Sequence, residues 1–229
     1  MSITRKIKTI GVVSALMTAA FVSGATAGTI TGSAHDFTDA IGWQSGEDQI
    51  CVFCHTPHNA DITVSDAPLW NHALTQVTTY TLYNLSPTFD GVATITQPEG
   101  TSLLCLSCHD GTVAVDSFGG TNDGTYFLSG SKDIGEPTGD GLLNDHPISF
   151  TYDEPLATLD GGLFDPTITD VTIGAGTDEK TGKITDIMLF SGKLQCATCH
   201  DVHNKFTDGD SLLRVTKVGS KLCLTCHDK

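Results

Sequence analysis

Hydrophobic and polar positions along the chain predict few regular elements. Apolar residues at 171–173 and at alternating positions in 183–190 indicate two strands, and the polar stretch 174–182 between them could close a hairpin. Short helices are expected over four cysteine-rich segments and over 68–74. Glycine-rich punctuation elsewhere indicates loops and tight turns. The pattern therefore predicts a mostly irregular fold with a few short helices and a small β-hairpin.

The first 27 residues have the pattern of a signal peptide. Three basic residues lie within the first eight, an apolar stretch follows at 10–22, and small residues occupy 25–27. An uncleaved anchor is the alternative, but the apolar stretch is short for a membrane span. No later segment is apolar enough to span a membrane. We therefore expect residues 1–27 to be removed on export, leaving a mature domain at 28–229.

Every cysteine of the chain belongs to a C-x-x-C-H motif. This motif is the attachment signature of c-type haem. Four disulfides would leave the trailing histidines unexplained, and a zinc site would not require histidine at the next position four times. One helical turn places the two thiols and the histidine on one face. The sequence predicts four covalently bound haem c groups, attached through Cys51, Cys54, Cys105, Cys108, Cys196, Cys199, Cys223 and Cys226.

Composition and charge limit the core and the partners. Aromatic residues make up 7% of the chain, and roughly 50 residues per haem favour a core built around four macrocycles. The formal net charge of −15 would become −18 on removal of the leader, because the leader carries three basic and no acidic residues. Such a surface disfavours nucleic acid and anionic membranes and suits basic or metal-bearing partners. Simple solubility is an equally good explanation of the charge.

The motifs form an internal repeat. Residues 51–59 and 196–204 share the pattern C-x-x-C-H-x-x-H-N, and residues 103–110 match 221–228 at six of eight positions. The mature domain therefore reads as a tetrahaem domain with pseudo-repeats at 51–110 and 196–228. A connecting segment at 111–195 joins them.

Histidine supplies the axial ligands in this reading. The proximal ligands are the motif histidines His55, His109, His200 and His227. Methionine could occupy a sixth position, but two of the three methionines lie in the leader, and Met188 fits the predicted strand as a packing residue. Bis-histidine ligation is thus the default. Five distal candidates remain for four irons, so one is surplus: His58, His203, His146, His35 and His72.

Two of the distal candidates carry a stronger prediction. His58 and His203 each follow a proximal histidine by three residues, on the same side of the attached porphyrin. The macrocycle would block them from the other face of their own iron, so each is expected to ligate a neighbouring haem. Among the remaining three, His35 is the expected donor if a ligand crosses between subunits, because it lies near the N-terminus.

Several segments carry a family resemblance. CVFCHTPHNA, PLWNHAL, LCLSCHDGTVAVDSFGG and HPISF resemble the multihaem cytochromes with doubled CxxCH motifs, over about residues 35–229. The four motifs, the signal peptide and the early histidine are also similar to the secreted tetrahaem cytochromes of metal-respiring bacteria. Some of those proteins polymerise into conducting filaments through a histidine that crosses between subunits. The resemblance implies redox-partner cytochromes, a periplasmic or extracellular location and a homopolymer as one form.

Two classes of function are compatible with the motifs. Two-sided histidine ligation leaves no vacant iron position, so the first expectation is electron transfer without catalysis, by a periplasmic shuttle or an extracellular conductor. The alternative is a periplasmic multihaem reductase of a small oxyanion with one open haem. A Lys in place of a motif histidine, which often marks an open haem, is not found in the sequence. A lipid anchor is excluded because every cysteine lies in a haem motif.

Overall fold

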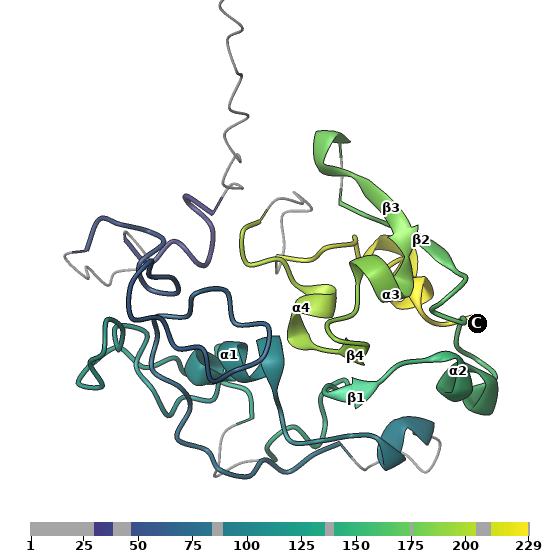
Figure 1. Ribbon diagram of the computed structural model, residues 1–229, viewed down its shortest axis with the longest axis horizontal. Coiled ribbons are helices and arrows are strands. Elements are labelled where there is room, and N and C mark those ends of the chain that lie inside the picture. Colours follow the sequence, from purple (N-terminus) through teal and green to yellow (C-terminus); the bar gives the residue numbers. More distant parts are fainter. Residues whose placement is uncertain are drawn as a thin grey trace, which may run out of the picture.

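Short helices and two small sheets, joined by long loops, make up the chain in the computed structural model shown in Figure 1. The structure describes residues 30–38, 47–83, 89–135, 140–174, 176–204 and 212–228. The predicted leader, 1–27, lies outside these ranges. Within them, no helix has the length and apolar character needed to cross a membrane.

The described residues contain four α-helices and four strands. The helices are α1 (Gly100–His109), α2 (Glu154–Asp160), α3 (Ile184–Ile187) and α4 (Cys196–Cys199). Strand β1 (Phe150–Thr151) pairs antiparallel with β4 (Lys193–Leu194), and β2 (Asp170–Ile173) pairs antiparallel with β3 (Lys180–Lys183). Single 3-10 turns occupy Asp90–Ala93, Gly130–Lys132, Gly176–Asp178, Val218–Ser220 and Cys223–Thr225. These elements fit the predicted class of few short helices and a small hairpin.

The hairpin is present, but the strand prediction for 183–190 is wrong for all but its first residue. Strand β3 ends there and α3 begins. Ile184, Ile187 and Met188 are all buried, and their spacing of three and four residues places them on one face of a helix. Gly182 allows the helix to fold back on the strand, because a Cβ at this position would lie 2.9 Å from the Ile187 side chain.

The helix predicted over 68–74 is also absent, and the segment is extended. Trp70 forms an isolated bridge with His55, and His72 forms another with Phe118. The backbone groups of this segment therefore bond to distant parts of the chain. They cannot at the same time make the local hydrogen bonds of a helix. Tertiary pairing decides the conformation here.

The largest apolar core lies mainly in the segment predicted to be a connection. It is formed by α2, α3 and the strands of both sheets, and it includes Met188, which packs there although not on a strand. A smaller cluster surrounds α1. Haem faces as a further source of buried apolar surface remain a prediction. The buried residues of the main core are Phe150, Tyr152, Leu156, Ala157, Val171, Ile173, Ile184, Ile187, Met188, Leu189 and Leu194.

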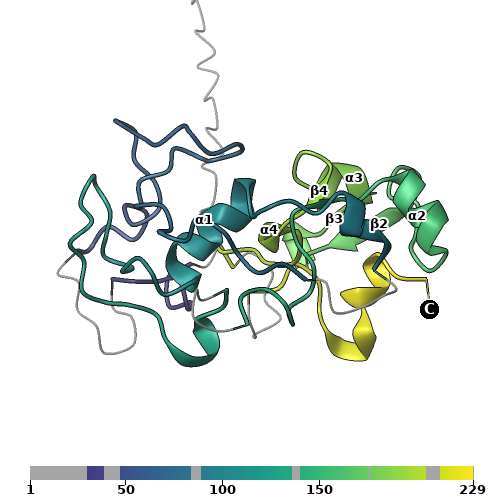
Figure 2. The ribbon, with the colours of Figure 1, turned by 90° about the horizontal axis from the view of Figure 1, so that it is seen from below.

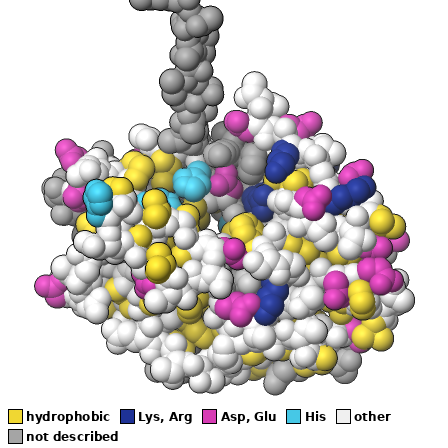
Figure 3. Space-filling view, viewed as in Figure 1, with side chains coloured by type: hydrophobic (Ala, Val, Ile, Leu, Met, Phe, Trp, Pro, Cys, Tyr) yellow, Lys and Arg dark blue, Asp and Glu magenta, His cyan; other side chains and the backbone are white. Residues whose placement is uncertain are grey.

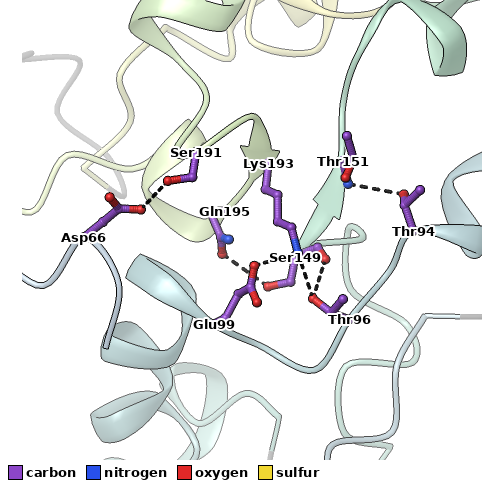
Figure 4. Close-up of polar contacts among 9 residues, drawn as sticks. All are labelled: Asp66, Thr94, Thr96, Glu99, Ser149, Thr151, Ser191, Lys193 and Gln195. Atoms are coloured by element: carbon purple, nitrogen blue, oxygen red, sulfur yellow. Dashed lines mark hydrogen bonds and ion pairs between the residues drawn. The ribbon is translucent and has the colours of Figure 1, made fainter. Parts of the chain in front are cut away.

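The chain is elongated, with the four motifs distributed along its length. Most of residues 47–135, including α1, form the left part of Figure 1, whereas the turn Asp90–Ala93 lies on the right near α2. Helix α4 lies near the middle, and the β2–β3 hairpin and C-terminal segment lie on the right. Figure 2 shows the same order from below. Polar contacts hold the middle together (Figure 4): Lys193 forms an ion pair with Glu99 at 2.6 Å, and Ser149 Oγ donates to Gln195 Oε1 at 3.2 Å. These contacts fix the strand pair β1–β4 against the segment that leads into α1.

Candidate haem sites

Each of the four C-x-x-C-H motifs forms a helix end or a tight turn. In the first, third and fourth motifs the N–H of the histidine donates to the carbonyl of the first cysteine, at 2.9, 3.1 and 3.0 Å. The second motif forms the last half of α1. The helix prediction is confirmed for the second and third motifs, whereas the fourth is a 3-10 turn and the first is a turn without helix assignment. Each backbone therefore places both thiols and the following histidine on one side, as haem attachment requires.

The second and third motifs are in direct contact. The backbone N–H of Cys196 donates to Ser102 Oγ of α1 at 3.0 Å. The Cys105 thiol donates a hydrogen bond to the sulfur of Cys196, which together with burial raises the pKa of Cys105 well above its ordinary value. The first turns of the two motifs thus present their sulfurs to each other across the α1–α4 contact. Haems attached here would be immediate neighbours.

The other two motifs extend this pair in opposite directions. Burial raises the pKa of the Cys54 thiol to about 11, and Cys54 in turn contributes to the raised pKa of Cys108. On the other side, burial raises the pKa of Cys199 to about 11, with Cys226 as the next cause. The anchor sulfurs therefore follow one another in sequence order. The chain of anchors begins and ends with exposed cysteines, Cys51 and Cys223.

Three proximal histidines face a second imidazole from a distant segment. The ring centroids of His55 and His203 are 6.2 Å apart with planes 13° from parallel. Those of His35 and His109 are 6.1 Å apart, and those of His146 and His227 are 6.5 Å apart. In each pair one histidine belongs to a C-x-x-C-H motif and the other lies far from that motif in the sequence.

The separations fit an iron held between two imidazoles. Opposite bonds of about 2.0 Å from one metal to two ring nitrogens, with roughly 1.1 Å from each nitrogen to its centroid, place the centroids about 6.2 Å apart. Two rings in direct stacking or edge contact also have centroids about 4.5–7 Å apart, so the separation agrees with an iron between the rings but does not require one. The three pairs lie between 6.1 and 6.5 Å. The separations would therefore allow each of the three pairs to hold a haem iron.

Hydrogen bonds orient one ring of each pair through Nδ1. His55 Nδ1 contacts the Pro68 carbonyl at 2.5 Å, and His109 Nδ1 contacts the Lys132 carbonyl at 2.7 Å. His146 Nδ1 contacts the carbonyl of the next residue at 2.9 Å. A backbone acceptor at Nδ1 fixes the tautomer and leaves Nε2 as the lone-pair nitrogen, the usual arrangement of a metal-ligating histidine.

His72 is placed differently from the other distal candidates. It is buried, with Nδ1 2.7 Å from the Ala73 carbonyl and Nε2 2.9 Å from the Ala114 carbonyl. Both ring nitrogens therefore face acceptors within the protein. Burial lowers its pKa, and the hydrogen bonds to these carbonyls oppose that shift. His72 Nε2 also lies 3.5 Å from the sulfur of Cys108, so it packs beside a cysteine of the second motif.

His35 lies within the chain's own histidine cluster. Burial lowers its pKa to about 4, and His109, His200 and His203 lower it further through their charges. The ring is therefore a neutral imidazole at pH 7, the form that ligates iron. The expectation that His35 is the donor between subunits stays a prediction. The structure places it opposite His109 of the same chain.

The last two histidines of the ligand set, His58 and His200, are both exposed. His200 is the proximal histidine that belongs to none of the three pairs above. The structure brings His203 to the first motif, which is the arrangement expected if the third motif lends its histidine to another haem. It does not bring His58 to His200 in the same way. Iron ligation by any of these residues stays a prediction.

No pattern in the sequence indicates the groups that orient the rings. Pro68 and Lys132 act through their backbone carbonyls, which any residue possesses, so residue identity could not reveal them. Arg214 was also not singled out. Its guanidinium donates to the Ala197 carbonyl at 3.1 Å and to the Ile187 carbonyl at 2.5 Å, which joins α4 to α3. Its position as the single arginine of the sequence outside the predicted leader was the only available indication.

Comparison with known proteins gives one match. Residues 189–229, which contain the third and fourth motifs, match the family model of the doubled CXXCH motif. No curated protein and no solved structure shows significant similarity to the chain. The matched motif is consistent with a multihaem c-type cytochrome and indicates covalently bound c-type haem.

Proposed function

We propose that the protein transfers electrons through four closely spaced, bis-histidine-ligated c-type haems. The observation that carries this proposal is the set of three histidine pairs at 6.1–6.5 Å, each containing a C-x-x-C-H histidine. A c-type haem supplies reversible one-electron chemistry at its iron. The protein residues attach it, fix the ligand tautomers and place successive anchors side by side.

The ligand set follows from the pairs and the repeat. His203 would be the distal ligand of the haem held by His55. In the same way, His35 would be the distal ligand of the haem held by His109, and His146 that of the haem held by His227. The third motif supplies His203 to the first, and the repeat assigns the reverse role to His58, which would serve the haem on His200. His72 is then the surplus histidine, since both of its ring nitrogens face carbonyls.

The order of anchors supports a route through the molecule. The sulfurs of the second and third motifs meet at the centre, and the first and fourth motifs lie on either side. The outer cysteines of the end motifs, Cys51 and Cys223, are exposed. Electrons would therefore enter and leave at the haems of the first and fourth motifs.

Haem content and spin state test the function. The exported holoprotein should show a mass increase of four haems, and its oxidised form should give only low-spin ferric signals in low-temperature electron paramagnetic resonance. One haem equivalent of high-spin iron per molecule would instead favour the reductase with an open haem. Fewer than four haems would contradict the proposed count.

Location and partners belong to the same proposal. Cytochrome c chemistry, the leader-like 1–27 and the absence of a membrane-spanning helix among the described residues support an exported protein in the periplasm or outside the cell. Acidic side chains are spread over the face shown in Figure 3, whereas its lysine and arginine side chains lie on the right-hand half. Redox partners with basic docking surfaces would suit the acidic areas.

A homopolymer is the second form that we propose to test. The exposed His58 is the residue best placed to supply a ligand to a neighbouring copy. Electron microscopy and size-exclusion chromatography of the secreted holoprotein should show filaments or higher oligomers if ligands are exchanged between copies, and His58→Ala should return them to single particles. Dispersed particles for the unaltered protein would contradict the polymer and leave the haem assignment intact.

A further inference from the structure

An aspartate directly follows the proximal histidine in three of the four motifs. These residues are Asp110, Asp201 and Asp228, whereas threonine follows in the first motif. Attachment and ligation of haem do not require this residue. The structure places the three aspartates in different environments, so their effects on the adjacent irons should differ.

Asp110 is buried and receives four hydrogen bonds. The Tyr80 hydroxyl donates to Oδ2 at 2.6 Å, and the Thr75 hydroxyl donates to the same oxygen. The N–H and hydroxyl of Thr112 donate to Oδ1 at 2.9 and 2.7 Å. The residue is 1% exposed. Four hydrogen bonds to its two oxygens stabilise the Asp110 carboxylate in this buried position.

The negative charge of Asp110 affects the pKa of the neighbouring Tyr80. Burial raises the pKa of Tyr80, and the hydrogen bond to Asp110 and its negative charge raise it further. No cation forms an ion pair with Asp110 among the described residues. Lys132 lies near His35, the residue paired with His109. Its side chain is exposed, so water screens its positive charge.

Of the other two aspartates, Asp201 lies near positively charged groups and Asp228 is exposed to solvent. The Asp201 side chain is 14% exposed, lies 3.7 Å from His203 Nδ1 and interacts with the charge of Arg214. Water and nearby cations therefore weaken the fields of both carboxylates at their own irons. Only the second motif combines a fully buried carboxylate with no paired cation.

We infer that Asp110 holds the haem of the second motif at the lowest reduction potential of the four. This inference rests on the proposed haem binding. Reduction adds one electron to a ferric iron, and a fixed negative charge in a low-dielectric environment opposes that addition. Asp110 acts on the iron through the electric field of its carboxylate. Along the proposed route, this haem would have a lower reduction potential than its neighbours, the haems of the first and third motifs.

Spectroelectrochemical titration of the four-haem holoprotein tests the inference. Asp110→Asn should shift the lowest midpoint potential in the positive direction, and Asp228→Asn, the matched change at an exposed aspartate, should leave every midpoint within the error of the titration. Tyr80→Phe removes one donor from the carboxylate while keeping its charge, so it should shift the lowest midpoint in the negative direction. A Cys105→Ala, Cys108→Ala variant should lack the lowest step.

The outcomes separate this inference from the proposed function. Fewer than four haems in the unaltered protein would contradict the proposed function. Four haems with an unchanged lowest midpoint in Asp110→Asn, or an equal shift in Asp228→Asn, would overturn the role of Asp110 alone. If Asp110→Asn does not fold, the sign of the shift in Tyr80→Phe decides: a negative shift supports the inference, and no shift or a positive one overturns it.

Discussion

Replacing His203 with Ala is expected to change the spin state of a haem that its own motif does not hold. The His203 ring lies 6.2 Å from that of His55, so its loss should open the iron attached through Cys51 and Cys54. Each iron has one sixth ligand. The expected amplitude is therefore one haem equivalent of high-spin ferric iron per molecule, with the remaining haems low-spin.

The fold should survive this change. The His203 side chain is 46% exposed, and its contact with Asp201 spans 3.7 Å. Substitutions at such positions usually alter the free energy of unfolding by no more than about 0.5 kcal/mol. Chemical denaturation should thus give nearly the same midpoint for the variant and the unaltered protein. A new high-spin signal would then report ligand loss and not unfolding.

Variants lacking one haem identify the affected iron. In a Cys51→Ala, Cys54→Ala background, His203→Ala should add no high-spin signal to the oxidised protein, as measured by electron paramagnetic resonance. In a Cys196→Ala, Cys199→Ala background it should add the full signal of one haem. The reverse pattern would refute the exchange of ligands between motifs, because it would show that His203 serves the haem of its own motif.

Three further predictions follow from the burial of single residues. His72→Gln should leave all haems low-spin and cost about 1–3 kcal/mol in the free energy of unfolding, because buried hydrogen-bond partners lose their geometry. Leu106→Ala in α1, at 0% exposure, should cost about 2–5 kcal/mol by denaturant titration. Acidification from pH 7 to 5 should produce no high-spin iron at the His35 site, since burial lowers its pKa from 6.5 to about 4 and the imidazole stays neutral.

Each of these predictions has a contradicting result. High-spin iron in His72→Gln would make His72 a ligand and remove its surplus status. For Leu106, the exposed Leu159→Ala is the control, and equal losses for both would show that α1 is not tightly packed. A high-spin signal that grows as the pH falls through 6.5 would mean that His35 titrates like an exposed histidine or is not the ligand.

The local elements were predictable where neighbouring residues decide them. The first strand of the hairpin, β2, follows from its alternating apolar positions. The second strand, β3, is polar and lies mostly in the predicted turn, because the helical spacing of Ile184, Ile187 and Met188 places α3 where the second strand was expected. The segment around Trp70 could not be predicted, because its backbone pairs with His55, which precedes it in the chain and belongs to a haem motif. Local propensity carries no information about such pairings.

The sequence alone determined the number of attachment motifs, the turn that aligns each pair of thiols with its histidine, and the excess of distal candidates by one. Tertiary structure decided which histidines meet. His35 and His109, or His55 and His203, are distant in sequence and are brought together only by packing of the segments between them. It also distinguished His72 from the other candidate ligands, and Asp110 from the other two aspartates. Burial and hydrogen-bond partners depend on the folded surroundings and not on the motif that a residue belongs to.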